Sequence, residues 1–304
     1  MDGILLIDKP QGLTSHDVVA RVRRLLRTRR VGHTGTLDPM ATGVLPVAVG
    51  QATRLVEFIM AGEKTYHATM KLGVITDTQD AEGQVVERRA VEPHCLEQLP
   101  EVLPRFTGDI EQIPPMYSAI KRNGVALHRL ARQGVDVDRP PRAVHIARIE
   151  ILRTGEDEAE LEVTCAKGTY IRTLVHDIGE TLGPGAHLTR LCRTRSGSFN
   201  LAQCIALDDV DEGILPGESP AFLTPIEAMR DYSRLEIVSE AAGRLADGVP
   251  PSLDQVVGKE DFAQGDVVAL TDDERLLAVA RFDPTRQKEK RGDFELLKVF
   301  NVFS

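Results

Sequence analysis

Residues 32–55 read GHTGTLDPMATGVLPVAVGQATRL. The glycines and the proline predict a loop over 32–43, and the apolar run at 44–50 predicts a buried strand directly after it. Asp38 stands inside this loop, and Pro39 pushes its backbone toward an extended conformation. A carboxylate displayed on a stiff loop can serve as a nucleophile, a base or a metal ligand. Most loop aspartates only cap a turn, and the residues alone favour that ordinary role for Asp38.

An amphipathic helix is expected just before the loop. A short apolar strand over 3–8 leads into the turn sequence DKPQG at 8–12. Thr14 or Ser15 then caps a helix, and Asp17 occupies the acidic position of a capping box. Apolar side chains recur at helical spacing along one face, which leaves several arginines on the flanks and the outer face. The apolar residues are Val18, Val19, Val22, Leu25 and Leu26.

Strands and helices follow the loop without a regular alternation of strand and helix. We expect helices over 52–60 and about 170–182, and strands over 65–72, 144–152, 159–166, 235–238, 267–270, 276–282 and 295–300. This mixture favours an α+β core with a small, mainly β C-terminal module. An acidic stretch containing Gly and Pro predicts a linker between them. The expected domains are therefore 1–207, a linker over 208–232, and 233–304.

The net charge of −9 argues at first against a nucleic-acid partner, but the charges are unevenly distributed. Residues 21–30 carry six arginines and no acid, and residues 121–148 carry seven basic residues against two acids. Residues 205–274 hold 17 acids and four bases. Local cations decide binding to a polyanion, because each cation that touches a phosphate releases counterions. Solvated helix faces are an equally good explanation of arginine runs. Charge alone leaves both readings open.

Several classes of protein are excluded by what the sequence lacks. No apolar run approaches the ~20 residues of a membrane span, and the N-terminus has no signal-peptide pattern. The four cysteines form no CxxC pair, so neither a zinc site nor a redox pair is indicated. The motifs GxGxxG, GxxxxGK[ST], HExxH and GxSxG are also missing, which removes the usual signatures of dinucleotide, phosphate-loop, zinc-protease and serine-hydrolase sites.

The segment at 32–55 resembles the catalytic signature of the TruB-type tRNA pseudouridine synthases. Four further blocks agree with that family in order and spacing: GILLIDKPQGLTS (3–15), KTYHATMKLGVITDTQDAEG (64–83), GDIEQIPPMYSAIK (108–121) and KGTYIRTLVHDIG (167–179). The resemblance covers most of residues 1–200. It implies the pseudouridine synthase fold, in which helices flank a central mixed or antiparallel sheet. Residues 233–304 resemble the small β-rich, RNA-binding PUA domain more weakly.

The resemblance also implies an isomerisation without a cofactor or metal. The family breaks the N1–C1′ bond of uridine 55 in the tRNA T-loop, turns the base, and joins C5 to C1′. Asp38 falls on the essential aspartate, which attacks C1′ or abstracts a sugar proton. Tyr66 matches a tyrosine that stacks on the uracil and is a candidate base for removing the C5 proton. Its alternative role is that of a core aromatic in an alternating strand. Arg172 matches the arginine that pairs with the aspartate; a helix-surface arginine is its alternative.

Further residues match positions that contact RNA in this family. Tyr170 corresponds to a tyrosine that contacts the target nucleotide, and Leu191 to an apolar residue packed under the base. His33 matches a histidine that fills the space left by flipped bases, since the target uridine must leave its stack. Lys9 belongs to a Lys-Pro motif that supports the active-site loop. From charge and position we add Arg24 and Arg27 as phosphate contacts. Each of these residues has an ordinary packing or surface role as its alternative.

Two other functions stay open at this point. One is a non-catalytic RNA-binding or RNA-chaperone protein with the same fold, and the joint presence of Asp38, Tyr66 and Arg172 argues against it. The other is a synthase for a different RNA, or one guided by partner proteins and a guide RNA. The short chain without basic tails favours the stand-alone bacterial type. We therefore expect a cytoplasmic monomer that binds the T-arm of tRNA, with no membrane contact and no obligatory protein partner.

Overall fold

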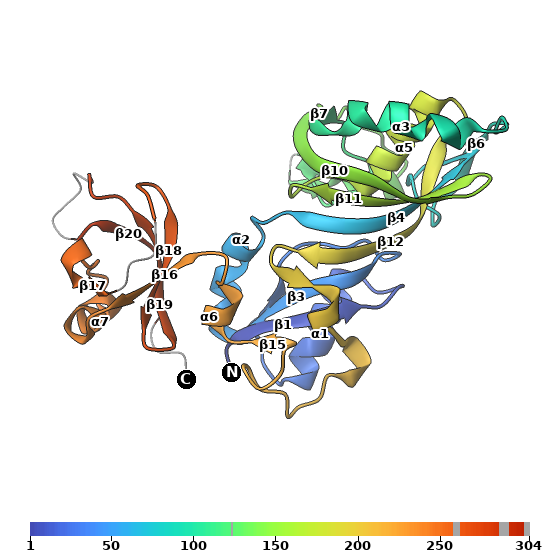
Figure 1. The fold of residues 1–304 in the computed structure, drawn as a ribbon. Helices are drawn as coiled ribbons and strands as arrows, with labels where there is room; N and C mark the ends of the chain where they lie inside the picture. Colours follow the sequence, from blue (N-terminus) through green and yellow to red (C-terminus); the bar gives the residue numbers. More distant parts are fainter. Residues whose placement is uncertain (123, 258–261, 286–291, 301–304) are drawn as a thin grey trace. The chain divides into compact units, whose positions relative to one another are not determined.

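The computed structural model describes residues 1–122, 124–257, 262–285 and 292–300. Figure 1 shows the fold with the chain coloured along the sequence. The chain divides into two compact units. The first unit comprises Met1–Leu37, Val44–Ala61 and Gly197–Ser304, and the second comprises Asp38–Gly43 and Gly62–Ser196. Each unit is described by itself.

All three segments of the first unit contribute to a group of short and long strands with helices. Its strand order is β14-β1-β3, with β15 antiparallel to β1 and β2 antiparallel to β3, while β14 runs parallel to β1. The strands are β1 (Gly3–Lys9), β2 (Val31–His33), β3 (Thr42–Val49), β13 (Phe199–Asn200), β14 (Ile205–Ala206) and β15 (Phe222–Leu223). The helices are α1 (Ser15–Leu25), α2 (Val56–Ile59) and α6 (Pro225–Ala228), with 3-10 helices η1 (Gly50–Leu55), η4 (Leu201–Gln203) and η5 (Leu207–Asp209).

The helix α1 begins as its sequence predicts. Thr14 is the N-cap, its hydroxyl accepts the Asp17 N–H at 3.1 Å, and the Asp17 carboxylate accepts the Thr14 N–H at 2.9 Å. Val18, Val19 and Val22 are buried, so the apolar face packs inward as expected. The helix expected over 52–60 is instead a 3-10 helix followed by a single α-helical turn. Thr53 Oγ1 donates to the Gly50 carbonyl at 2.8 Å and supports the tighter first turns.

A second sheet at the C-terminal end of the first unit has five strands in the order β17-β16-β18-β19-β20. Its elements are β16 (Ser233–Ile237), α7 (Ser239–Ala246), η6 (Leu253–Gln255), β17 (Val256–Val257), β18 (Val267–Asp272), β19 (Arg275–Phe282) and β20 (Phe294–Val299). The expected C-terminal strands therefore all exist, and residues 301–304 of the expected domain lie outside the described residues. The predicted linker contains β15, whose Phe222 is fully buried. The domain limits themselves stay a prediction.

In the second unit, neighbouring strands pair antiparallel in the order β12-β4-β11-β10-β7. Thr42 and Gly43, at the start of β3, pair in parallel with Cys192 and Arg193 of β12. The strands of the unit are β4 (Lys64–Leu72), β5 (Val74–Thr76), β6 (Val85–Arg88), β7 (Gly108–Gln112), β8 (Lys121–Arg122), β9 (Val125–Ala126), β10 (Arg142–Thr154), β11 (Glu158–Cys165) and β12 (Ala186–Ser196). Its helices are α3 (Leu99–Val102), α4 (Leu127–Arg132), α5 (Ile171–Leu182), η2 (Cys95–Gln98) and η3 (Leu103–Phe106).

Helix α5 is the element that matters most for the site. It packs against β12 through an apolar face whose Leu174 and Ile178 are fully buried, and it ends at Gly183, where φ is 107°. Mixed and antiparallel pairing, flanking helices and a separate C-terminal sheet confirm the predicted α+β class. Among the described helices, none combines the length and the hydropathy that crossing a bilayer requires.

Candidate active site

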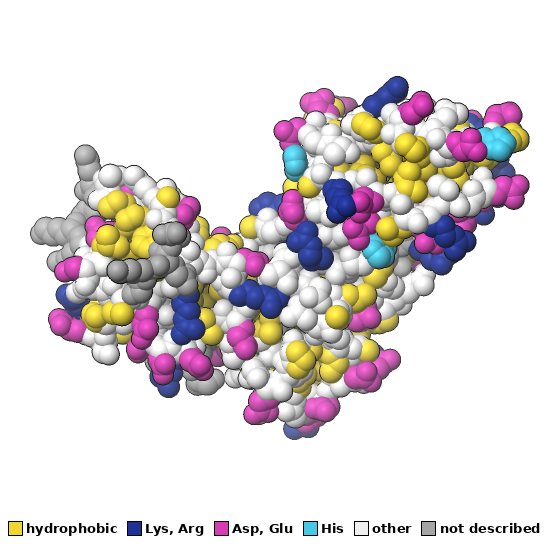
Figure 2. Space-filling model, viewed as in Figure 1, with side chains coloured by type: hydrophobic (Ala, Val, Ile, Leu, Met, Phe, Trp, Pro, Cys, Tyr) yellow, Lys and Arg dark blue, Asp and Glu magenta, His cyan; other side chains and the backbone are white. Residues whose placement is uncertain are grey.

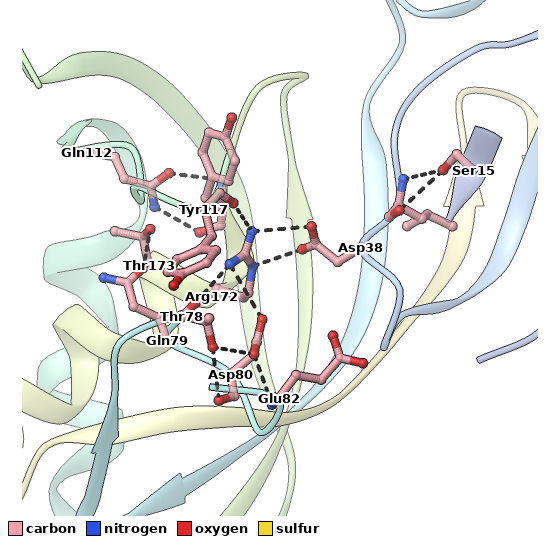
Figure 3. Close-up of polar contacts among 12 residues, drawn as sticks. Ser15, Asp38, Thr78, Gln79, Asp80, Glu82, Gln112, Tyr117, Arg172 and Thr173 are labelled. Carbon is pink, nitrogen blue, oxygen red and sulfur yellow. Dashed lines mark hydrogen bonds and ion pairs between the residues drawn. The ribbon is translucent and has the colours of Figure 1, made fainter. Parts of the chain in front are cut away.

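Asp38 and Arg172 form an ion pair within the second unit (Figure 3). Arg172 Nε donates to Asp38 Oδ2 at 2.9 Å, and its Nη2 donates to Asp38 Oδ1 at 3.2 Å. This two-pronged contact is the geometry that a guanidinium offers to a carboxylate. The Arg172 side chain is 3% exposed, whereas that of Asp38 is 33% exposed. The arginine therefore holds the carboxylate from the protein side, and part of the carboxylate stays open.

Three further acceptors surround the Arg172 guanidinium. Nη1 donates to the Thr78 carbonyl at 2.8 Å, and Nη2 donates to the Tyr117 carbonyl at 2.9 Å. The Asp80 carboxylate lies 3.4 Å from Nη1. Burying a cation is costly unless it is paired and hydrogen-bonded, and this set of acceptors supplies both conditions. Arg172 is thus no helix-surface arginine.

Asp80 is itself buried and rigidly held. Its Oδ1 accepts the Thr78 hydroxyl at 2.6 Å and the Glu82 N–H at 3.0 Å, which leaves Oδ2 for Arg172. Asp80 is not among the residues predicted from the sequence. A signal was available in the run DTQD at 77–80, where acidic and polar residues follow the apolar strand β5 and precede Gly83. Thr78 and Tyr117 act through their backbone carbonyls, so no side-chain pattern could reveal them.

The helix α5 places Arg172 as its second residue. Its N-cap Tyr170 has no side-chain capping bond; instead the buried Gln112 amide accepts the Tyr170 N–H at 2.8 Å and donates to the Tyr170 carbonyl at 3.0 Å. A cation in the first helical turn opposes the helix dipole, and the carboxylates of Asp38 and Asp80 near that turn reverse the balance. The two carboxylates therefore compensate the cation at this end of the helix.

Tyr66, Leu191 and Arg193 lie on one face of the sheet. Tyr66 of β4 is directly opposite Arg193 of β12, and Leu191, two residues earlier, is opposite Ala68. Directly opposed residues project to the same side of a sheet. Leu191 is 7% exposed and Tyr66 is half-buried. Burial raises the pKa of the Tyr66 phenol, against the opposing effect of Arg193, and the Asp38 charge raises it further.

Tyr170 belongs to the same group of residues. It is half-buried, and burial raises the pKa of its phenol, with the Asp38 charge acting in the same direction. The structure therefore brings Asp38, Tyr66, Tyr170, Arg172 and Leu191 into one unit, with Asp38 close enough to act electrostatically on both tyrosines. All five residues are among those predicted from the sequence. Their chemical roles stay predictions.

The other predicted residues lie in the first unit. Lys9 is fully buried at the end of β1 and donates from Nζ to the Pro10 carbonyl at 2.9 Å, so it is no surface lysine. His33 ends β2, its ring lies edge-on to His16 with centroids 5.1 Å apart, and its Nδ1 accepts the Gly35 N–H at 3.3 Å. Arg24 and Arg27 are exposed near the end of α1.

Comparison with known proteins identifies the family of the chain. The family profile "TruB family pseudouridylate synthase (N terminal domain)" matches residues 23–171, and "tRNA pseudouridylate synthase B C-terminal domain" matches residues 172–229. A protein of Syntrophotalea carbinolica called tRNA pseudouridine synthase B is 47% identical over 302 residues, which span 99% of this chain and 98% of that protein. The chain belongs to the TruB family of pseudouridylate synthases.

Other TruB-family relatives and solved structures extend the comparison. The protein of the same name from Geotalea uraniireducens is 41% identical, over 99% of this chain and 98% of that protein. An H/ACA RNP bound to a substrate RNA containing 2′-deoxyuridine aligns with a TM-score of 0.75 and 28% identity, over 99% of this chain and 85% of that chain. A Cbf5-Nop10-Gar1 complex aligns at 0.74 and 30% identity, over 98% of this chain and 84% of that chain. The chain is therefore an RNA pseudouridine synthase, an isomerase.

Proposed function

We propose that this enzyme converts uridine 55 in the T-loop of tRNA to pseudouridine, with Asp38 as the nucleophile or base. The observation that carries the proposal is the Asp38 carboxylate, gripped at both oxygens by a buried arginine and still partly open. The names of its relatives, tRNA pseudouridine synthase B, support tRNA as the substrate. The reaction consumes neither electrons nor water, so it needs no cofactor and no metal.

The chemistry begins at the sugar of the target uridine. Asp38 either attacks C1′ or removes a sugar proton, and in both cases the N1–C1′ bond breaks and its electron pair stays with the uracil ring. The ring then turns, and C5 bonds to C1′. Arg172 keeps the carboxylate oriented through the cycle, because its own position is set by Asp80 and two carbonyl oxygens.

Recognition of the target needs a flipped uridine, which costs a few kcal/mol of lost stacking. We assign stacking and apolar contact with the uracil to Tyr66, Tyr170 and Leu191, and the filling of the vacated space to His33. Lys9 supports the active-site loop from its buried position. Arg24, Arg27 and a PUA-like domain over 233–304 contact the phosphates of the T-arm. The enzyme acts in the cytoplasm as a monomer without a partner protein.

Carbodiimide treatment followed by primer extension tests this function, since it marks pseudouridine within a tRNA. Purified enzyme and an unmodified tRNA transcript should give one new stop, at the position of uridine 55. A transcript with cytidine at that position is the control. Stops at other uridines of tRNA, or only in other RNAs, would contradict the proposed target.

Asp38→Asn tests the residue that carries the chemistry. The substitution keeps the side-chain shape and removes the reactive charge, so turnover should vanish while tRNA affinity stays within roughly tenfold of wild type. Single-turnover assays and filter binding measure the two quantities. Normal turnover by the purified variant would assign the chemistry to another group.

A further inference from the structure

Arg193 is the largest fully buried side chain among the described residues. It is 2% exposed and lies directly opposite Tyr66 on the neighbouring strand. Its guanidinium acts on the Tyr66 phenol both through its charge and through a side-chain hydrogen bond. Burying a guanidinium is costly unless the surroundings compensate, and the Tyr66 hydroxyl is one of the groups that it contacts.

The backbone that carries Arg193 is tightly fixed. A Cβ atom on Gly43 would lie 2.3 Å from the Arg193 carbonyl oxygen and 2.9 Å from its nitrogen, and Gly43 has a φ of +98°. Only glycine therefore fits where β3 meets β12. This close approach sets the register of Arg193 in the same segment that leads from Asp38 into β3.

Two opposite charges act on Tyr66 from two sides of the site. Arg193 lowers the pKa of the phenol, and Asp38 raises it, while burial is the largest contribution and also raises it. From β11, Cys165 adds to the rise, and its thiol is neutral at pH 7 because burial raises its own pKa to about 11. The charge that the reaction can change is that of Asp38, whereas Arg193 stays charged throughout.

We propose that Arg193 is a positioning residue that lets Tyr66 act twice: its guanidinium stabilises the Tyr66 phenolate after Tyr66 has given its proton to the departing uracil and until it takes the C5 proton. This inference rests on the roles of Asp38 and Tyr66 proposed above. It adds the residue that makes proton return possible within the site, without an external acid or base.

Atoms and charges balance over the cycle. In the first step the N1–C1′ bond breaks, its electron pair goes to the uracil, and the Tyr66 hydroxyl proton neutralises the ring at N1. Asp38 bonds to C1′ or takes a sugar proton, and loses its charge in either route. In the second step C5 bonds to C1′, and Asp38 either leaves C1′ or returns its proton to the sugar carbon, so that it is a carboxylate again. The Tyr66 phenolate then removes the C5 proton, which leaves N1–H pseudouridine and a neutral tyrosine.

The charges also set the order of these events. While Asp38 is anionic, its field opposes ionisation of Tyr66 and keeps the proton on the phenol. When the first step consumes that charge, Arg193 still acts on the oxygen, and the phenolate becomes easier to form. Tyr66 thus changes from acid to base in step with Asp38.

Titration of Tyr66 tests the electrostatic part without any turnover. The near-ultraviolet absorbance of the phenolate is followed against pH, and the curve of the Tyr66→Phe variant is subtracted. Asp38→Asn should lower the pKa of Tyr66, and Arg193→Gln should raise it. Arg195→Gln is the matched control, because Arg195 is on the same strand but bonds to Thr65 and Glu63 instead. Equal curves for Arg193→Gln and Arg195→Gln would overturn the proposal.

Kinetics on tRNA deuterated at C5 of uridine test the chemical part. Arg193→Gln should slow single turnover roughly 100-fold, with KM little changed, and should increase the primary isotope effect at C5. Arg193→Lys should recover part of the rate, since it restores the charge, and Arg195→Gln should match wild type. In a Tyr66→Phe background, Arg193→Lys should cause no further loss. An isotope effect equal to that of wild type in Arg193→Gln and Arg193→Lys would refute the assignment.

The two proposals can fail separately. If the wild-type enzyme leaves uridine 55 unmodified, the proposed function is wrong, and the titration still reports on the charges. If wild type is active while Asp38→Asn leaves the Tyr66 titration unchanged and Arg193→Gln titrates as Arg195→Gln does, only the present inference is wrong. Asp38→Asn leaves Arg193 unchanged, so that arm of the test does not depend on whether Arg193→Gln folds.

Discussion

At the scale of single residues, the site is organised around one buried guanidinium. Arg172 uses its fork to bind Asp38 and its remaining N–H groups to bind two carbonyl oxygens, with Asp80 alongside (Figure 3). Each contact fixes the direction of another, so the carboxylate of Asp38 is held in one orientation without blocking its open side. Such pre-organisation reduces the entropy cost of reaching the reactive geometry.

Arg172→Lys should cripple catalysis although it keeps the charge. A lysine ammonium is a point donor and cannot hold both Asp38 oxygens and reach the Thr78 and Tyr117 carbonyls in one geometry. We expect kcat to fall by at least about 100-fold, which corresponds to roughly 2.7 kcal/mol of transition-state stabilisation. Single-turnover rates at saturating tRNA measure it. Rates near wild type would mean that the fork is dispensable.

Asp80→Asn should lower the rate less than Arg172→Lys does. It retains the shape of the side chain and removes one charge from the guanidinium, so Arg172 keeps its bonds but is less strongly held. A charged hydrogen bond contributes about 1.5–3 kcal/mol, which predicts a loss of roughly 10- to 100-fold in kcat. Asp77→Asn is the control, since Asp77 lies in the same turn and bonds to Gln84 and Tyr117 instead. Equal kcat values for Asp80→Asn and Asp77→Asn would show that the Asp80 charge does not contribute to catalysis.

At the scale of elements, the start of β3 depends on one glycine. β3 lies parallel to β12 at Thr42 and Gly43, directly after the loop that holds Asp38. The backbone of Arg193 approaches Gly43 so closely that no side chain fits. The spacing between Asp38 and the face of Tyr66 and Leu191 is therefore set by a backbone contact, and not by any reactive group.

Gly43→Ala should destabilise the protein and slow catalysis together. A left-handed φ costs a non-glycine residue about 1–2 kcal/mol, and the clash with the Arg193 carbonyl adds to it. Gly12→Ala is the matched control, because Gly12 has a φ of +87° and nothing within 4 Å of the added Cβ. Urea unfolding of both variants separates strain from clash. A loss of stability no larger than that of Gly12→Ala would show that β12 moves aside freely.

At the scale of the whole molecule, charges are more mixed than the sequence predicts. Figure 2 shows basic and acidic side chains interspersed on one face. The acidic stretch 205–274 and the arginines of residues 21–30 are far apart in the sequence, yet Asp208 pairs with Arg21 at 2.5 Å and Glu212 pairs with Arg27 at 2.8 Å. These are contacts within the first unit. They are exposed pairs of small energy, so a phosphate can compete for the same arginines.

Replacing Arg24 and Arg27 by glutamine should weaken tRNA binding and flatten its salt dependence. Each lost phosphate contact removes about 0.7–0.9 from the slope of log affinity against log salt. Turnover of bound tRNA should change much less, because these side chains contact no reacting atom. A double variant of the exposed Arg105 and Arg153 makes the same change of net charge and serves as control. An unchanged slope would show that Arg24 and Arg27 do not contact phosphates and form only a solvated helix face.

The C-terminal sheet shares a hydrophobic core with the N-terminal part of the first unit. Ala269, Val279 and Phe300 share an apolar cluster with Leu55 and Ile59. Arg54 adds a hydrogen bond to the Val299 carbonyl at 2.6 Å and stacks over the Phe300 ring. Removal of residues 233–304 would therefore expose apolar surface of the N-terminal part. Point substitutions are the better probe of RNA binding by this sheet.

The amino-acid sequence by itself predicts the local elements and names Asp38 as the candidate reactive residue. Neighbouring residues suffice to predict the capping box of α1, the alternation of β11 and the glycine at the end of α5. The loop around Asp38 identifies the family. The sequence does not predict β12, because its polar residues and two register shifts break the alternation of a half-buried strand. The sequence pattern also does not single out Asp80 and Arg193. Their importance comes from contacts across 92 and 127 positions of the chain, with Arg172 and Tyr66 respectively. Strand pairing brings Arg193 to Tyr66, and the N-terminus of α5 brings Arg172 to Asp80. Only the tertiary structure therefore decides which charges act on these side chains.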